Sequence, residues 1–286
     1  MAAIVVDGNA LAREVRSEAG SLLSRLASRG LRSPSLAIVQ IGDDAGASLY
    51  TRRLQRSFAD TGVRVEVRQL AASASQGEAL ACIAELSRDQ AIDAIQVQTP
   101  VPAHIGFSAL ADALDPAKDV DGVHPINAGL LAQGRPAIVP ATPLGGFEIL
   151  TRHGIAISGA RAVVVGRSPT VGRPMALLLL QHDATVTVCH TRTKSLGSIV
   201  AEAEILAVAA GRPRLIAAEM VRPGSAVIDF GVSVVDGKAV GDVDPAAADR
   251  AGLYTPVPGG TGPMTTAILL RNAITLYCRA HGVAEP

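Results

Sequence analysis

Short runs of aliphatic and β-branched residues alternate with segments of helical periodicity along almost the whole chain. The runs that predict strands are 35–40, 64–68, 94–98, 162–165, 185–189, 205–209 and 226–229. Apolar residues spaced three and four apart predict helices over 47–60, 76–87, 144–153 and 171–181, with a last helix from 263 to about 279. Strands that alternate with helices are typical of βαβ units, so we predict an α/β fold with mainly parallel sheets.

A stretch rich in proline and glycine, residues 114–146, separates two groups of these units. Such composition is typical of a crossing between compact domains. We therefore predict two α/β domains, one over 1–140 and one over 141–262. The last helix, within 263–286, is expected to return to the first domain.

Composition narrows the class of ligand. The 26 basic and 26 acidic residues cancel, and only 2% of residues are aromatic, which disfavours nucleic acid as a partner. No apolar run approaches the length of a membrane span, and no basic segment followed by an apolar one marks a signal peptide. The three cysteines lie far apart, and no histidine has zinc-site spacing. We expect a cytoplasmic protein that binds a small molecule, with no metal.

A glycine-bounded turn follows the strand at 162–165. Gly166 and Gly172 enclose it, and an apolar helix comes next. Free N–H groups at a helix N-terminus bind anions, so this turn is a candidate phosphate site. Its spacing differs from the G-x-G-x-x-G fingerprint, and an ordinary tight turn remains an alternative.

The end of the next strand indicates which nucleotide would bind. An NAD site commonly offers an acidic residue there, but residues 189–194 contain none. Arg167 and the hydroxyl of Thr191 would instead suit a 2′-phosphate, which favours NADP. Arg192 and Lys194 are more simply explained as solvated surface charges.

Six segments, in order, resemble the bifunctional methylenetetrahydrofolate dehydrogenase/cyclohydrolase family, and the similarity runs nearly end to end. The most specific is Thr-Pro-Val-Pro-Gly-Gly-Thr-Gly-Pro-Met at 255–264. The others are 41–50, 98–102, 118–125, 165–174 and 241–244. Their joint occurrence in this order makes a chance match very improbable.

The resemblance implies a fold and an activity. Members of the family bind folate in a cleft between two domains, of which the second is Rossmann-like and binds NADP. They oxidise 5,10-methylenetetrahydrofolate and hydrolyse the methenyl product to 10-formyltetrahydrofolate. The implied partners are therefore tetrahydrofolate one-carbon derivatives and a second copy of the chain, since the family forms homodimers through the nucleotide-domain sheet.

The resemblance also implies roles for particular residues. Tyr50 would stack on the aminobenzoate ring, Asp121 would bind the pterin, and Gln98 would orient a catalytic lysine. The implied cofactor-binding residues are Gly166, Arg167, Ser168, Gly172, Thr191, Val232, Gly259, Gly260 and Thr261. Taken singly, each has an ordinary structural explanation, such as core packing for Tyr50 or a turn for Asp121. The motifs together favour the functional interpretation.

One position departs from the family pattern. Four residues after the tyrosine, where the family has its catalytic lysine, this chain has Leu54. Hydride transfer depends on alignment, whereas hydrolysis needs proton delivery, so we expect the dehydrogenase to persist and the cyclohydrolase to be weak or lost. Alternatives are a fully bifunctional enzyme rescued by Lys118 or ordered water, a non-catalytic folate- or NADP-binding paralogue, and a dehydrogenase of another substrate.

Overall fold

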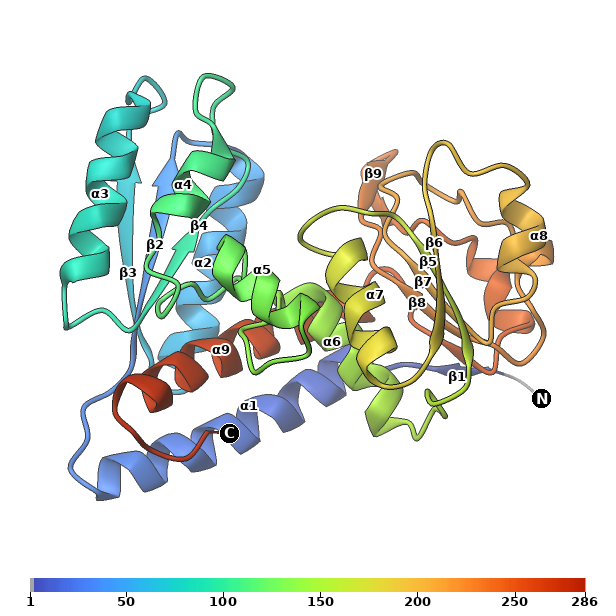
Figure 1. The fold of residues 1–286 in the computed structure, drawn as a ribbon, viewed down its shortest axis with the longest axis horizontal. Coiled ribbons are helices and arrows are strands. Elements are labelled where there is room, and N and C mark those ends of the chain that lie inside the picture. The colour runs from blue at the N-terminus through green and yellow to red at the C-terminus, as the bar shows by residue number, and fades with distance from the viewer. Residues whose placement is uncertain (1–2, 286) are drawn as a thin grey trace. The chain divides into compact units, whose positions relative to one another are not determined.

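The computed structural model describes residues 3–285, which form two compact units (Figure 1). We call them the six-stranded unit and the three-stranded unit. The six-stranded unit contains the N-terminal residues through Arg13 and Pro140–Ile268. The three-stranded unit contains Glu14–Val139 and the chain from Leu269 onward. Two long helices, α1 (Gly8–Ser28) and α9 (Thr261–Ala280), contribute residues to both units.

The six-stranded unit is built on a parallel sheet with strand order β1-β11-β8-β7-β5-β6. Its strands are β1 (Ile4–Val5), β5 (Arg161–Val165), β6 (Thr185–Cys189), β7 (Ile205–Val208), β8 (Ala226–Asp229) and β11 (Leu253–Tyr254). The α-helices of this unit are α6 (Ala141–Arg152), α7 (Gly172–Gln181) and α8 (Leu196–Val200), beside the first turns of α1 and α9. The strands β5, β7 and β8 are almost wholly buried because a parallel sheet is covered on both faces.

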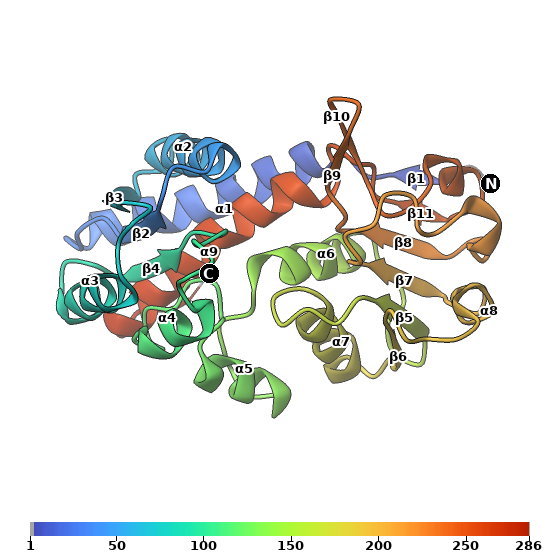
Figure 2. The same ribbon diagram turned by 90° about the horizontal axis from the view of Figure 1, so that it is seen from above.

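An antiparallel hairpin, β9 (Ser233–Val235) and β10 (Lys238–Val240), extends away from this sheet (Figure 2). Asp236 and Gly237 form its turn, both with positive φ, as a tight hairpin turn requires. Short 3₁₀ helices at Ala218–Met220 and Pro245–Asp249 complete the unit.

The three-stranded unit has the parallel strand order β3-β2-β4. Its elements are β2 (Ser35–Ile41), α2 (Ala45–Ala59), β3 (Arg64–Leu70), α3 (Gln76–Arg88), β4 (Ala94–Val97), α4 (Phe107–Ala113) and α5 (Pro125–Ala132). Helices α3 and α4 lie on one face of the sheet and α2 on the other (Figure 2). Side chains along β2 alternate between the two faces of the sheet, so one set packs toward α3 and α4 and the other toward α2.

The α/β class and the two-domain organisation predicted from sequence are confirmed. The predicted strands and helices all form. The sequence pattern did not predict the helices α1, α4, α5 and α8 or the short strands β1, β9, β10 and β11. The helix expected over 144–153 begins at Ala141, because Pro143 is tolerated in a first turn.

The predicted boundary at the N-terminus requires correction. Residues 1–140 were assigned to one domain, yet β1 pairs with β11 in the six-stranded sheet. The pairing is reinforced where the Gly8 N–H donates to the Gly259 carbonyl at 2.9 Å. None of the helices within 3–285 combines the length and apolar character needed to cross a bilayer.

Candidate functional site

A pocket of about 360 Å³ opens at the carboxyl ends of β5, β6 and β7 in the six-stranded unit. Loops that follow parallel strands meet at this edge, which is the usual ligand edge of such sheets. The lining residues are Val165, Gly166, Arg167, Ser168, His190, Thr191, Thr193, Leu196, Ala209, Ala210, Arg212 and Leu215.

Close backbone packing explains both glycines of the β5–α7 turn. Gly166 has φ 129°, and a Cβ there would lie 2.2 Å from the Ala209 carbonyl oxygen. A Cβ on Gly172 would lie 2.3 Å from the Gly166 carbonyl oxygen. The Ser168 hydroxyl accepts from the N–H groups of Val171 and Gly172, at 3.2 and 3.3 Å, and so completes the start of α7. Only glycine at both positions permits this tight turn.

The charged side chains that line the pocket are cationic. Arg167 comes from the turn after β5, and Arg212 from the loop after β7. No carboxylate is among the lining residues that the structure describes, and hydroxyls of Thr191 and Thr193 are present. Such a surface suits a phosphate group, which guanidinium groups bind with charge-assisted hydrogen bonds.

The pocket unites four of the cofactor-binding residues predicted from sequence, Gly166, Arg167, Ser168 and Thr191. Gly172 packs against Gly166 of the lining. The pocket lining does not include Gly172, Val232, Gly259, Gly260 or Thr261. Val232 follows β8, and residues 259–261 follow β11, at the same edge of the sheet. Val232 is 67% exposed, and Thr261 is buried with its hydroxyl donating to the Asp229 carbonyl at 2.9 Å.

Two buried aspartates hold the loops at this edge. Asp242 Oδ2 accepts from the N–H groups of Ala210 and Gly211, at 2.6 and 2.8 Å, and thereby fixes the loop that carries Arg212. Asp229 accepts from the N–H groups of Gly231, Asp242 and Val243. Burial raises the pKa of Asp229 to about 6, although these three hydrogen bonds oppose the change.

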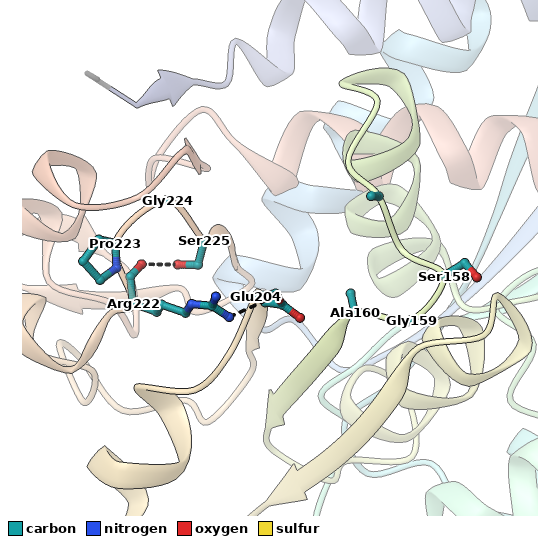
Figure 3. Close-up of a pocket in the computed structure, with 9 residues that line it drawn as sticks. Ser158, Gly159, Ala160, Glu204, Arg222, Pro223, Gly224 and Ser225 are labelled. Atoms are coloured by element: carbon teal, nitrogen blue, oxygen red, sulfur yellow. Dashed lines mark hydrogen bonds and ion pairs between the residues drawn. The ribbon is translucent and has the colours of Figure 1, made fainter.

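A second hollow of the six-stranded unit, about 450 Å³, lies at the opposite edge, before β5, β7 and β8 (Figure 3). Its charged side chains pair with each other, since Arg222 Nη1 lies 3.1 Å from Glu204 Oε1. The Ser225 hydroxyl likewise donates to the Arg222 carbonyl at 2.8 Å. Because these groups pair with each other, the pocket at the carboxyl ends of β5, β6 and β7 is the better candidate for an anion site.

A polar layer lies at the carboxyl end of the three-stranded sheet. Gln40 and Gln98 directly follow the paired residues Val39 and Val97, and the Gln98 N–H donates to the Val39 carbonyl at 2.9 Å. Gln40 is bound to α2, because its Oε1 accepts from Thr51 at 3.0 Å and its Nε2 donates to Ser48 at 2.8 Å. Helix α2 therefore covers the face of the sheet on which the Gln40 side chain lies.

Asp121 adds a carboxyl group close to β4. It is half-buried, and the Gln96 Nε2 donates to its Oδ1 at 3.2 Å. The pKa of Asp121 is raised to about 7, chiefly by burial and also by the nearby Asp119 carboxylate, while the Gln96 hydrogen bond opposes the rise. Asp119 is itself buried and accepts from the His124 N–H and the Asn127 amide. A carboxyl that titrates near neutral pH is typical of a functional site.

Helix α2 carries Tyr50 and Leu54. Tyr50 is partly exposed, whereas Leu54 is 0% exposed. Leu54 belongs to the buried row Ala47, Thr51, Leu54 and Phe58, which faces the sheet. Arg52, Arg53 and Arg56 lie on the exposed side of the helix. The buried face of α2 therefore offers one hydroxyl and no charged group.

Lys118 is the only lysine in the sequence of the three-stranded unit. Its Nζ donates to the carbonyls of Leu86 and Asp89, at 3.3 and 2.7 Å, at the C-terminal end of α3. This end of α3 precedes β4, so the ammonium lies at the opposite edge of the sheet from Gln98. The ammonium supports the end of a helix, where a cation is favourable.

The lining residues that were not predicted are Val165, His190, Thr193, Leu196, Ala209, Ala210, Arg212 and Leu215. Arg212 had a usable signal, since it follows the carboxyl end of a predicted strand, as Arg167 does. Gln96 was also missed. It lies within a strand prediction, where a polar residue is easily taken for a solvent-facing one.

Comparisons with known proteins relate both parts of the chain to one family. Residues 6–121 match the family model described as tetrahydrofolate dehydrogenase/cyclohydrolase, catalytic domain. Residues 140–281 match the model described as tetrahydrofolate dehydrogenase/cyclohydrolase, NAD(P)-binding domain. The bifunctional protein FolD of Chloroflexus aurantiacus is 53% identical over 277 residues, which cover 96% of this chain and 97% of the relative.

Solved structures of the same family are similar to this chain over nearly its whole length. The bifunctional enzyme FolD from Campylobacter jejuni has a TM-score of 0.95 and 38% identity, covering 98% of this chain and 100% of that one. The Trypanosoma brucei methylenetetrahydrofolate dehydrogenase-cyclohydrolase, complexed with NADP cofactor and inhibitor, has a TM-score of 0.94 and 36% identity, covering 98% and 99%. The resemblance inferred from sequence and the prediction of a nicotinamide nucleotide domain are both confirmed.

Proposed function

Because the chain belongs to the tetrahydrofolate dehydrogenase/cyclohydrolase family, we propose that it oxidises 5,10-methylenetetrahydrofolate to 5,10-methenyltetrahydrofolate and hydrolyses the methenyl product only weakly. The observation that carries this proposal is the lack of a usable ammonium on the buried face of α2. Leu54 is fully buried there, and the one lysine of the unit is bound to the end of α3.

The two reactions make different demands on this site. In the oxidation, a hydride leaves the methylene carbon and the lone pair of the adjacent nitrogen forms the C=N bond of the methenyl product. Alignment carries this step, and no protein acid or base is required. Hydrolysis requires an activated water and a proton delivered to nitrogen, help that is typically worth about 10²–10⁴-fold. Leucine at position 54 is compatible with the oxidation, but it cannot supply the proton that the hydrolysis requires.

Folate would be held by Tyr50, Gln98 and Asp121, as the family resemblance implies. Tyr50 offers a ring face, and Asp121 offers a carboxyl group that accepts hydrogen bonds from a pterin. These residues bind and orient, and none of them needs to transfer the hydride. Gln98 directly follows β4, and Tyr50 lies on α2, the helix that follows β2. Asp121 is hydrogen-bonded to Gln96 near the end of β4, so the three residues belong to neighbouring elements, which supports the assignment.

The cofactor is proposed to be NADP rather than NAD. NADP, when bound, supplies the hydride acceptor. Arg167 and Arg212 line one pocket with Thr191, and the lining holds no carboxylate among the described residues. An acidic residue there would repel a 2′-phosphate, whereas two guanidinium groups attract it.

The first prediction concerns the two half-reactions. With purified protein, methylenetetrahydrofolate and NADP, NADPH should form while methenyltetrahydrofolate accumulates, because oxidation proceeds and hydrolysis lags. The methenyl absorbance and NADPH are followed on one preparation, with NAD in parallel. Rapid enzyme-dependent hydrolysis of added methenyltetrahydrofolate would favour a bifunctional enzyme, and NADP binding without NADPH would favour a non-catalytic paralogue.

The second prediction concerns Leu54→Lys. An ammonium on the buried face of α2 should raise the rate of methenyl hydrolysis at least about tenfold, because it restores a proton donor and acceptor. The matched control is Leu54→Met, an apolar chain of similar length, which should leave hydrolysis unchanged. Equal hydrolysis rates in both variants, with both folded by circular dichroism, would contradict the role assigned to position 54.

The third prediction concerns cofactor choice. Arg167→Ala and Arg212→Ala should each raise the KM for NADP about tenfold or more, since hydrogen bonds to charged groups contribute about 1.5–3 kcal/mol. The KM for NAD should change much less. Arg192→Ala is the control, because Arg192 is exposed and does not line the pocket. If the two KM values rise in parallel, the arginines do not select for NADP.

The fourth prediction concerns assembly. Strand β6 is at the edge of the six-stranded sheet, and Val188 is 40% exposed on it. An unpaired edge offers N–H and C=O groups to another strand, so we expect two copies to pair through β6. Sedimentation should give twice 29.3 kDa. Val188→Lys should shift the protein toward a monomer, whereas Val234→Lys on the β9–β10 hairpin should not, and a monomeric parent protein would contradict the proposal.

A further inference from the structure

Gln96 is a buried amide in the middle of β4, with 6% of its surface exposed. Its strand neighbours, Ile95 and Val97, pack in the core cluster beneath α3 and α4. Because side chains alternate along a strand, Gln96 points to the opposite face, on which its partner Ile38 and the following Gln40 also lie. This is the face that α2 covers.

The amide of Gln96 is only partly satisfied. Its Nε2 donates to Asp121 Oδ1 at 3.2 Å. Its Oε1 is buried and has no hydrogen-bond partner among the residues that the structure describes. A buried acceptor without a partner destabilises the fold, whereas a leucine of similar size would not. Packing alone therefore does not account for glutamine at this position, and the bond to Asp121 is what the amide contributes.

We propose that Gln96 is a positioning residue for the pterin of the folate substrate and that it acts through Asp121. The inference rests on the function proposed above. The bond from Nε2 holds one carboxylate oxygen of Asp121, so the other is left to accept from N–H groups of the pterin. An N–H donor also favours the ionised carboxylate, which is the form that accepts at both oxygens.

The surroundings of Asp121 make this bond important. Asp119 faces it with a second carboxyl group, which raises the pKa of Asp121, and Gln96 opposes that change. The Lys118 ammonium is bound to carbonyls at the end of α3, and the His124 Nδ1 accepts from the Ile126 N–H. Neither supplies Asp121 with a hydrogen bond, so a neutral amide performs the task for which a cation is often used.

The test uses Gln96→Leu in the full chain. The KM for methylenetetrahydrofolate should rise about tenfold while kcat changes less than about threefold, as expected for a lost bond to a charged group that acts in binding. The acid limb of the pH profile of kcat/KM should move to higher pH, because the variant no longer favours ionised Asp121. The urea midpoint should stay the same or rise, because a poorly satisfied amide has been replaced.

Two further variants sharpen the result. Gln69→Leu makes the same change on β3, away from Asp121, and should leave KM and the pH profile unaltered. Gln96→Glu places another carboxylate beside Asp121 and should move the acid limb further than leucine does. A structural role for Gln96 would lower the urea midpoint and would not move the acid limb.

Binding of tetrahydrofolate by titration calorimetry separates the two proposals. If the parent protein binds tetrahydrofolate but forms no NADPH, the proposed function fails, while a tenfold weaker affinity in Gln96→Leu still supports the inference. If the parent is active and Gln96→Leu matches it in KM and pH profile, the inference is wrong and the function stands. A parent protein that neither binds nor reacts would overturn both.

Discussion

The structure depends on one constraint, the parallel direction of every strand within each main sheet. The carboxyl ends of parallel strands lie at a common edge of the sheet. Residues that are far apart in the sequence are therefore brought together at that edge. In the six-stranded unit this edge brings Arg167 and Arg212 into one pocket. In the three-stranded unit it places Gln98 beside Gln40 beneath α2. Both candidate sites follow from the same rule.

Buried carboxyl groups then fix the loops at these edges. Asp242 holds the backbone beside Arg212, and Asp229 holds the chain after β8. Near Asp121, Asp119 likewise holds the chain by accepting from the His124 N–H and the Asn127 amide. Asp119 and Asp242 each retain one oxygen without a partner among the described residues. Incomplete satisfaction of this kind is expected where a fold is arranged for binding rather than for maximal stability.

Sequence alone predicted much of this arrangement, for identifiable reasons. The strands were recognisable because a parallel sheet requires continuous apolar runs, and the β5–α7 turn because its glycines are sterically required. The pairing of β1 with β11 was not recognisable, because two residues carry too little periodicity to locate a strand. Arg212 and Gln96 were missed because their importance depends on which loops meet and which face is covered. Only the tertiary structure supplies that information.

Leu54 and Gln96 share one environment in the three-stranded unit. Both belong to the layer between α2 and the sheet, and the described side chains there bring amides and hydroxyls but no ammonium. Such a layer can orient a ligand and hold a carboxylate in its charged form, but it supplies no proton to a leaving nitrogen. The function we propose follows from this environment, since hydride transfer between aligned partners depends on geometry, whereas hydrolysis depends on proton delivery.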